Sequence, residues 1–187
     1  RIISSKEDIA AAAKDFANYE SSKYLVEEFL EGHEISIEAF IHSGEFYYYC
    51  FAVRDIESIS NGKIIEHGSI SDPLYDDTNL NEVKKVFEVA CLALGIEEGP
   101  VKGDVLYTNS GPSILEVASR SAPLAPLISG RIYGTDMVSI HIKWVLDQDF
   151  VFKPLPVEFS KSKPVSHRIL LHEPGTLKGI GGIDEAK

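Results

Sequence analysis

Residues 101–120 constrain the fold of this chain more than any other stretch. They contain two short apolar runs, 105–107 and 114–117, and residues 108–112 between the runs are Thr-Asn-Ser-Gly-Pro. Asn, Ser, Gly and Pro favour turns, and short apolar runs on either side of a turn are typical of paired strands. The stretch therefore predicts a β-hairpin.

The predicted hairpin carries acidic residues on both strands. Side chains alternate between the faces of a strand, so Asp104 and Glu116 can point to the same side, with Lys102 and Arg120 close by. Carboxylates bind Mg²⁺ while leaving positions for water and phosphate, and cations neutralise charge on phosphoryl or acyl oxygens. The spacing is equally compatible with a surface hairpin whose charges are solvated.

The composition is that of an ordinary globular chain. Of its 187 residues, 44% are hydrophobic and 25% are charged, enough for one domain with a sizeable core or for one domain with an appendage. The sequence contains no apolar run long enough to span a bilayer. Its net charge of −11 argues against general binding to nucleic acid, which depends on clustered Lys and Arg. We therefore expect neither a membrane nor a nucleic acid as a partner.

Cysteine and methionine usage bear on location and completeness. Cys50 and Cys91 lie in apolar segments that suit buried free thiols, so we expect a reducing, cytoplasmic location. The single methionine is Met137, and no leader pattern precedes the first expected helix. We therefore expect the chain to be a piece of a longer polypeptide.

The hydrophobic pattern predicts a mixed fold. Helices are expected over 4–19, with Ser4 or Ser5 as the N-cap, 79–94 and about 135–146, and strands over 24–30, 34–41, 45–55, 64–65, 105–107, 114–117 and 167–171. In 34–41 the alternation predicts one buried face. A turn at 60–63, a chain stop at 71–73, a linker at 147–156 and a glycine-rich turn at 178–182 complete the pattern. This order predicts an α+β fold with an antiparallel sheet.

Two segments carry a resemblance to a known family. Residues 25–36, Leu-Val-Glu-Glu-Phe-Leu-Glu-Gly-His-Glu-Ile-Ser, resemble an acidic hinge followed by Gly-x-Glu, and Asp104 with residues 114–120 resembles paired metal acids and a following arginine. Together they are similar to the C-terminal half of an ATP-grasp domain, as found in biotin carboxylase, carbamoyl phosphate synthetase and the amino-acid ligases. The resemblance implies an ATP-grasp portion over 1–150, and a linker with a small C-terminal β segment over 151–187.

The resemblance implies a nucleotide site at the hinge. Adenine would lie against the backbone of Glu27, Glu28, Phe29 and Leu30, and Glu34 would accept hydrogen bonds from the ribose hydroxyls. A strand edge offers a donor and an acceptor at fixed spacing, which suits a flat heteroaromatic edge. The alternative is that these glutamates form a solvated acidic edge.

The resemblance also assigns roles to the charged residues. Asp104 and Glu116 would hold Mg²⁺, or Mn²⁺ in its place, against the ATP phosphates. Lys102 would stabilise the transition state, Arg120 would steady the carboxylate or acyl phosphate, and Arg54 would lie near the γ-phosphate. A surface role is the alternative for Arg54.

Other positions depart from the pattern or carry weaker indications. Ala118 stands where many members have an asparagine ligand, which leaves a second Mg²⁺ in doubt. His67 begins a loop that would border the acceptor site, although a loop histidine is more often structural. We expect structural roles for His141 and His172 and a helix-capping role for residues 134–136.

The implied function is ATP-dependent ligation. Members of this family activate a carboxylate as an acyl phosphate, which an amine then attacks, so the partners would be ATP, a small carboxylate and an amine, and a homodimer is compatible with the pattern. The phosphate-grasping N-terminal part would belong to the same polypeptide, and this piece alone would have no turnover. Two alternatives stay open: a degenerate ATP-grasp module for nucleotide binding or assembly, and an unrelated α+β domain with ordinary surface acids.

Overall fold

The fold is a single antiparallel sheet with helices on both faces. The computed structural model describes residues 2–17, 23–58, 64–71, 77–147, 150–152, 164–170 and 175–182. The strands are β1 (His33–His42), β2 (Glu45–Ser58), β3 (Ile64–Ser71), β4 (Gly99–Thr108), β5 (Gly111–Ala118) and β6 (Val165–Arg168), in the spatial order β5-β4-β1-β2-β3-β6. The helices are α1 (Lys6–Phe16), α2 (Asp77–Ala93), α3 (Ala125–Tyr133) and α4 (Met137–Leu146). The predicted α+β class with an antiparallel sheet is confirmed.

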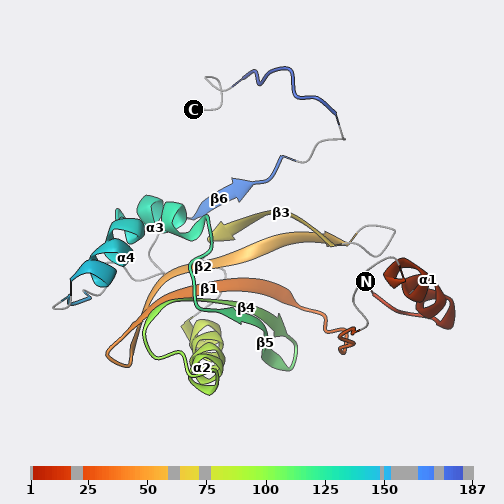
Figure 1. Ribbon diagram of the computed structural model, residues 1–187, viewed down its shortest axis with the longest axis horizontal. Helices are drawn as coiled ribbons and strands as arrows, with labels where there is room; N and C mark the ends of the chain where they lie inside the picture. Colours follow the sequence, from red (N-terminus) through yellow and green to blue (C-terminus); the bar gives the residue numbers. More distant parts are fainter. Residues whose placement is uncertain are drawn as a thin grey trace.

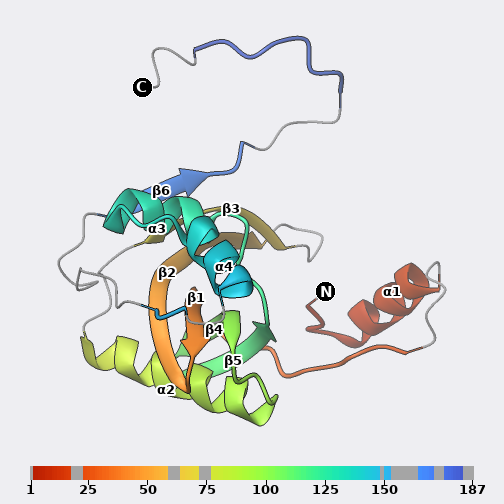
Figure 2. The ribbon, with the colours of Figure 1, turned by 60° about the vertical axis from the view of Figure 1, so that its left-hand side comes forward.

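Helices lie on both faces of the sheet (Figure 1). Helix α2 lies across one face, and α3 and α4 lie on the other, beside β6 (Figures 1 and 2). Helix α1 stands apart from the sheet in both views, with Ser5 as its N-cap accepting from the Asp8 amide. None of the described helices is long and apolar enough to cross a membrane.

Strands β1 and β2 form a hairpin with a tight turn and one bulge. The turn residues Ser43 and Gly44 both have positive φ, 52° and 80°, the backbone that matches the twist of two paired strands. Along the hairpin, Glu38 pairs with Cys50 and Ala39 with Tyr48, so Tyr49 is an extra residue. The bulge places Tyr49 and Cys50 in the same buried cluster, beneath α3 and α4.

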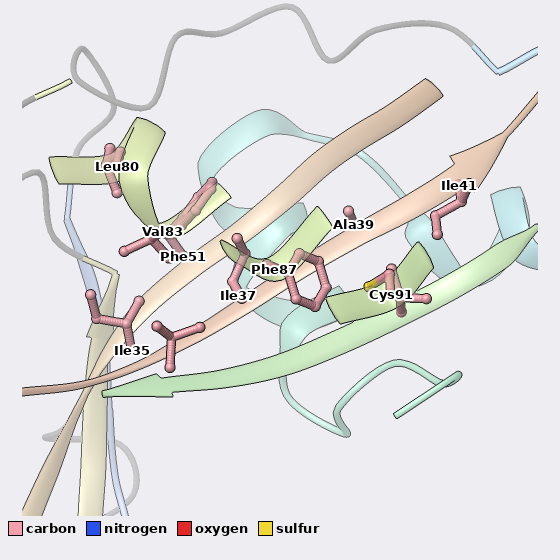
Figure 3. Close-up of a cluster of buried hydrophobic side chains, with 11 residues drawn as sticks. Ile35, Ile37, Ala39, Ile41, Phe51, Leu80, Val83, Phe87 and Cys91 are labelled. Atoms are coloured by element: carbon pink, nitrogen blue, oxygen red, sulfur yellow. The ribbon is translucent and has the colours of Figure 1, made fainter. Parts of the chain in front are cut away.

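Strand β1 is buried on both faces, which corrects the predicted single buried face. Its odd-numbered residues from 35 to 41 pack beneath α2 (Figure 3). On the other face, Phe40 is fully buried, and its ring centroid lies 5.1 Å from those of Trp144 and Phe152. The alternation described the strand correctly, but the second helical layer covers the face that we expected to be polar.

Helix α2 is fixed by its end and by one close approach to the sheet. Gly95 has φ of 70°, its amide donates to Leu92, and the Ile96 amide donates to Cys91, which is the Schellman ending of a helix. A side chain at Gly103 would clash with the ring of Phe87, at 2.5 Å. Because Gly103 has no side chain, the Phe87 ring can pack against the backbone of β4 in the core.

The β4–β5 hairpin is confirmed and is longer than predicted. Its loop is Asn109–Ser110, and the Thr108 hydroxyl both donates to the Gly111 carbonyl and accepts from the Ser110 amide. A bulge at Leu115 lies between the pairs Asp104–Glu116 and Val105–Ile114. The hairpin forms one edge of the sheet beside β1.

Helix α3 was not predicted, because no helix or strand was expected between the central hairpin and residue 135. Pro126 lies in the first turn of α3, where the missing amide costs nothing. Gly134 ends the helix with φ of 65°, and the Asp136 side chain caps α4 by accepting from the Ser139 amide. The capping role of residues 134–136 is thus confirmed.

The strand predicted over 24–30 is wrong. Residues 23–31 have no regular secondary structure, because no described strand pairs with them, and a strand is stable only when its backbone groups are paired. Leu25 and Val26 are largely exposed, while Tyr24 stacks on Phe16 at 4.9 Å. The apolar run was real, but a run alone does not supply a partner strand.

The C-terminal elements differ in extent from the prediction. Strand β6 begins at Val165 rather than at residue 167, and it pairs with β3 at the edge of the sheet. Phe152, inside the predicted linker, is 3% exposed in the core beneath α3 and α4. Residues 178–182 have no regular structure. The expected turn at 60–63, residues 72–73 and His172 lie outside the described residues.

Candidate functional site

The two acids of the central hairpin lie on the same face of the sheet. Asp104 and Glu116 are direct partners in the β4–β5 register, so their side chains project to the same side. The side chain of Asp104 is 9% exposed, whereas that of Glu116 is 56% exposed. One carboxylate is thus fixed inside the protein and the other is open to solvent.

Lys102 places its ammonium group between these acids. Its Nζ forms an ion pair with Asp104 and lies 3.9 Å from Oε1 of Glu116. Lys102 is 5% exposed, and a buried ammonium is tolerated only with a charged partner. Its cross-strand partner is Ala118, whose small side chain adds no donor or acceptor.

Arg54, on β2, forms ion pairs with carboxylates on three other strands. Its guanidinium lies 2.9 Å from Glu34 on β1, 3.1 Å from Asp104 on β4 and 3.6 Å from Glu66 on β3. Arginine suits this position because its planar fork offers several donors in fixed directions. We call this group the acid–base cluster; it consists of Glu34, Arg54, Glu66, Lys102, Asp104 and Glu116.

The acid–base cluster has an excess of negative charge. It holds four carboxylates against two cations, so two negative charges are unbalanced by its own members. Burial raises the pKa of Glu34, and Arg54 opposes that rise. An added divalent cation would balance the excess.

The donor set fits Mg²⁺ in type and number. Magnesium binds to proteins through one or two carboxylates and keeps water or phosphate in its other positions, and Asp104 and Glu116 provide such a pair. Among the described residues there is no group of three or more His, Cys, Asp or Glu side chains that could hold a metal. Both oxygens of Asp104 already contact a cation, Oδ1 with Arg54 and Oδ2 with Lys102. An ion would therefore have to displace one of these contacts.

The predicted nucleotide and carboxylate residues are not all gathered at the acid–base cluster. Arg120 is exposed beyond the end of β5, and its guanidinium donates to the Ser121 carbonyl at 3.3 Å. Glu27, Glu28 and Phe29 are exposed in the irregular segment before β1, and Leu30 is half-buried there. Of the predicted hinge set, only Glu34 lies in the acid–base cluster, through its ion pair with Arg54.

His67 lies in a strand, which corrects its predicted place in a loop. It belongs to β3, and its carbonyl accepts a hydrogen bond of 2.8 Å from the Ile169 amide. The short strand predicted at 64–65 continues to Ser71 because β2 and β6 pair with it on both sides.

A buried glutamate beside the acid–base cluster was not predicted. Glu38 is 1% exposed; its Oε2 accepts from the Tyr49 hydroxyl at 2.9 Å and from the Ala122 amide at 3.1 Å. Burial raises the pKa of Glu38 to about 7. The sequence held a signal for this residue: Glu38 shares one face of a strand with Phe40, a large apolar residue that favours burial of that face.

A polar network extends from Glu38 toward α4. The Tyr49 hydroxyl also lies 2.8 Å from the Ser121 hydroxyl, which lies 3.5 Å from Nδ1 of His141. Burial lowers the pKa of His141, as it disfavours the charged imidazole. A cavity of about 220 Å³ adjoins these groups, lined by Glu38, Arg54 and Glu66 together with apolar residues of α3.

Comparison with known proteins identifies the fold. The structure of an L-amino acid ligase from Bacillus licheniformis superposes with a TM-score of 0.75 at 17% identity, covering 98% of this chain and 46% of that one. The chain has the ATP-grasp fold. Comparison with models of protein families finds no match, and neither does comparison with curated protein sequences.

Two further ATP-grasp structures are similar. N5-carboxyaminoimidazole ribonucleotide synthetase from Thermus thermophilus gives a TM-score of 0.61 at 17% identity, covering 87% of this chain and 41% of that one. The biotin carboxylase domain of 2-oxoglutarate carboxylase from Hydrogenobacter thermophilus was solved with MgADP. It gives a TM-score of 0.64 at 13% identity, covering 82% of this chain and 35% of that one. The chain thus spans less than half the length of each of these three structures.

Proposed function

We propose that this chain forms the C-terminal portion of the nucleotide-binding domain of an ATP-dependent carboxylate–amine ligase. One observation supports the proposal above others: Asp104 and Glu116 are register partners on one face, with Lys102 and Arg54 beside them. Paired carboxylates with adjacent cations suit the binding of a magnesium–phosphate group better than they suit catalysis by a nucleophilic side chain.

In this proposal the chain's own residues position the ATP phosphates and neutralise their negative charge. Asp104 and Glu116 would hold Mg²⁺, or Mn²⁺ in its place, which when bound shields the negative charge of the phosphates. Lys102 and Arg54 would face the phosphoryl oxygens, where charge develops as the γ-phosphoryl group passes to the carboxylate. Chemistry of this kind depends on orientation, so the dense pairing around Arg54 would keep its guanidinium aimed at the site.

The other predicted residues complete the proposal. The backbone of Glu27, Glu28, Phe29 and Leu30 would contact adenine once a neighbouring strand orders that segment. Arg120 would steady the carboxylate or the acyl phosphate. The exposed apolar residues of this segment, Leu25 and Val26 among them, are compatible with a surface that the rest of the polypeptide covers.

Further parts of the proposal concern the whole protein. The similar structures include an L-amino acid ligase, a ribonucleotide synthetase and a carboxylase domain solved with MgADP, which supports ATP and magnesium as cofactors. We place residues 1–150 in the ATP-grasp portion and residues 151–187 in a linker with a small β segment. Two buried free cysteines, Cys50 and Cys91, favour the cytoplasm.

A second function has its own support. Ala118 supplies no ligand, and both oxygens of Asp104 are occupied by cations within the chain. These features are compatible with a module that binds nucleotide or assembles with other parts without catalysis. Titration of ATP into the longer polypeptide, together with turnover, distinguishes the two functions.

The test is ADP release by the longer polypeptide that contains this chain, screened against amino acids with MgATP. We expect turnover that falls by a factor of about 100 or more in Glu116→Gln, since metal-mediated stabilisation amounts to several kcal/mol. Glu98→Gln, at the far end of the sheet beside His42, should keep wild-type turnover. The 187-residue chain alone should release no ADP. Near-normal turnover in Glu116→Gln would remove Glu116 from the site.

A further inference from the structure

The segment that carries Arg120 is fixed by side chains that the proposed chemistry does not use. The connection from β5 to α3 runs over the sheet face below α3 and α4, and two of its residues contact the buried network. The Ala122 amide donates to Glu38, and the Ser121 hydroxyl lies 2.8 Å from that of Tyr49. Arg120 immediately precedes Ser121, so the network sets the path of the backbone that presents Arg120.

Glu38 is a costly residue to bury, and its hydrogen bonds explain its place. A carboxylate at 1% exposure loses most of its hydration, and an apolar side chain of the same size would pack without that cost. Two donors reach its Oε2, one from the bulge of β2 and one from the connection after β5. A single oxygen therefore ties together two segments that are far apart in the sequence.

The bulge in β2 is necessary for this arrangement. Because Tyr49 is the extra residue of the bulge, it joins Cys50 in the cluster beneath α3 and α4, while Tyr48 faces α2. The hydroxyl of Tyr49 thereby lies between Glu38 and Ser121. Without the bulge, strict alternation would place only one of Tyr49 and Cys50 on this face.

We propose that Glu38 is a positioning residue that latches the backbone of Ser121 and Ala122 to the sheet and so holds Arg120 in place for the carboxylate or acyl phosphate. The positioning of Arg120 rests on the role proposed above for that residue. The latch itself rests only on the two hydrogen bonds and the bulge. We call the group of Glu38, Tyr49, Ser121 and Ala122 the latch.

The chain offers a matched control on the opposite face of the same strand. The Tyr48 hydroxyl donates to Glu88 at 2.6 Å, so Tyr48–Glu88 is also a tyrosine–glutamate pair on β2, but it faces α2. Tyr48→Phe and Glu88→Ala therefore remove a comparable contact without touching the latch. A general loss of stability should appear in the Tyr48 and Glu88 variants as well as in the Tyr49 and Glu38 variants. A loss that is confined to the latch should appear only in the Tyr49 and Glu38 variants.

The first measurement is hydrogen exchange of the Ala122 amide, followed by NMR in the chain without ligand. We expect Glu38→Ala to accelerate this exchange about 10- to 100-fold, as removal of a charged acceptor does, and Tyr49→Phe about 3- to 10-fold. Glu38→Gln keeps an acceptor oxygen and should restore most of the protection. Tyr48→Phe and Glu88→Ala should leave the exchange rate of the Ala122 amide unchanged.

The second measurement separates the latch from the proposed function. In the longer polypeptide, Tyr49→Phe and Glu38→Ala should lower kcat about 10-fold while the KM for ATP stays within about twofold, because Arg120 is proposed to act on the acyl group. If the wild-type protein releases no ADP, the proposed function fails, and the exchange data still decide the latch. Ala122 exchange at the wild-type rate in Tyr49→Phe, with Glu38→Ala either also at the wild-type rate or unfolded, would overturn the latch.

Discussion

The two faces of the sheet differ in the side chains that they bury. The face beneath α2 is apolar throughout its buried core, from Ile35 and Ile37 to Phe87, and its Tyr48–Glu88 hydrogen bond joins part-buried groups that pack against that core. The opposite face combines an apolar cluster beneath α3 and α4 with the acid–base cluster and the latch. The comparison shows that stability can come from one face while the other holds charges in fixed positions.

The difference also appears within single strands. In β1 the odd-numbered residues from 35 to 41 are all apolar, whereas the even-numbered residues include Glu34 in the acid–base cluster and Glu38 in the latch. In β2 the bulge at Tyr49 shifts the alternation by one residue, so that Tyr48 before it and Phe51 after it both face α2. Each strand therefore contributes packing to one layer and chemistry to the other.

The largest effect should come from the apolar face. Phe87→Ala removes a fully buried ring that packs against Gly103, so we expect a loss of about 4 kcal/mol in the free energy of unfolding. Denaturant unfolding measures this loss. Val89→Ala, on the exposed side of α2, should change it by less than about 0.5 kcal/mol. Similar losses in both variants would mean that α2 does not pack as described.

The next effect compares a cation on each face. Lys102→Met leaves Asp104 buried with one cation fewer, so we expect a loss of about 3 kcal/mol. Lys84→Met removes cation–π contacts at 5.2 Å from the Tyr48 ring and 5.6 Å from the Phe51 ring, and should cost about 1 kcal/mol or less. If thermal unfolding ranks the two variants in the opposite order, the charged face is not buried as the structure has it.

A third prediction uses pH to separate the faces. The pKa of Glu38 is about 7 in the folded protein, above its value of 4.5 in the unfolded chain, so the folded state binds this proton more tightly. Its contribution to stability should fall as pH rises from about 4.5 to 7, by about 3 kcal/mol. Glu38→Gln should remove that slope, and Glu88→Gln on the other face should keep it. Parallel pH profiles for wild type and Glu38→Gln would contradict the burial of Glu38.

The smallest effect should lie at the rim of the charged face. The side chain of Glu66 is 34% exposed and lies 3.6 Å from Arg54, which already contacts two nearer carboxylates. Glu66→Gln should therefore cost less than about 1 kcal/mol, and added salt should reduce the cost further. Urea unfolding at low and high salt measures it. A salt-independent cost above about 2 kcal/mol would place Glu66 inside the cluster rather than at its rim.

The sequence predicts the apolar face better than the polar one. Alternation identified the residues beneath α2, and the turn residues after Tyr107 identified the hairpin that joins Asp104 and Glu116. It did not predict α3, since prolines at a helix start and prolines in a loop look alike in a sequence. The false strand at 24–30 has a related cause, because pairing depends on a distant segment that periodicity cannot show.

The polar site was only half visible for a similar reason. Asp104, Glu116 and Lys102 lie within one hairpin, so local spacing places them together. Arg54, which only the family resemblance indicated, and Glu66, which nothing indicated, join them through the register of β1, β2 and β3, and Tyr49 joins the latch only through a bulge. Long-range pairing of this kind leaves no local periodic signal.

The most direct test of the account is paramagnetic broadening of NMR signals by Mn²⁺ in the presence of ATP, because broadening reports occupancy even when binding is weak. We predict that the amide signals of Asp104 and Glu116 broaden first, and that Glu116→Gln reduces the effect while Glu98→Gln does not. Broadening centred on residues 27–31, or equal broadening in the Glu116→Gln protein, would contradict the claim that this pair of acids holds the metal–nucleotide.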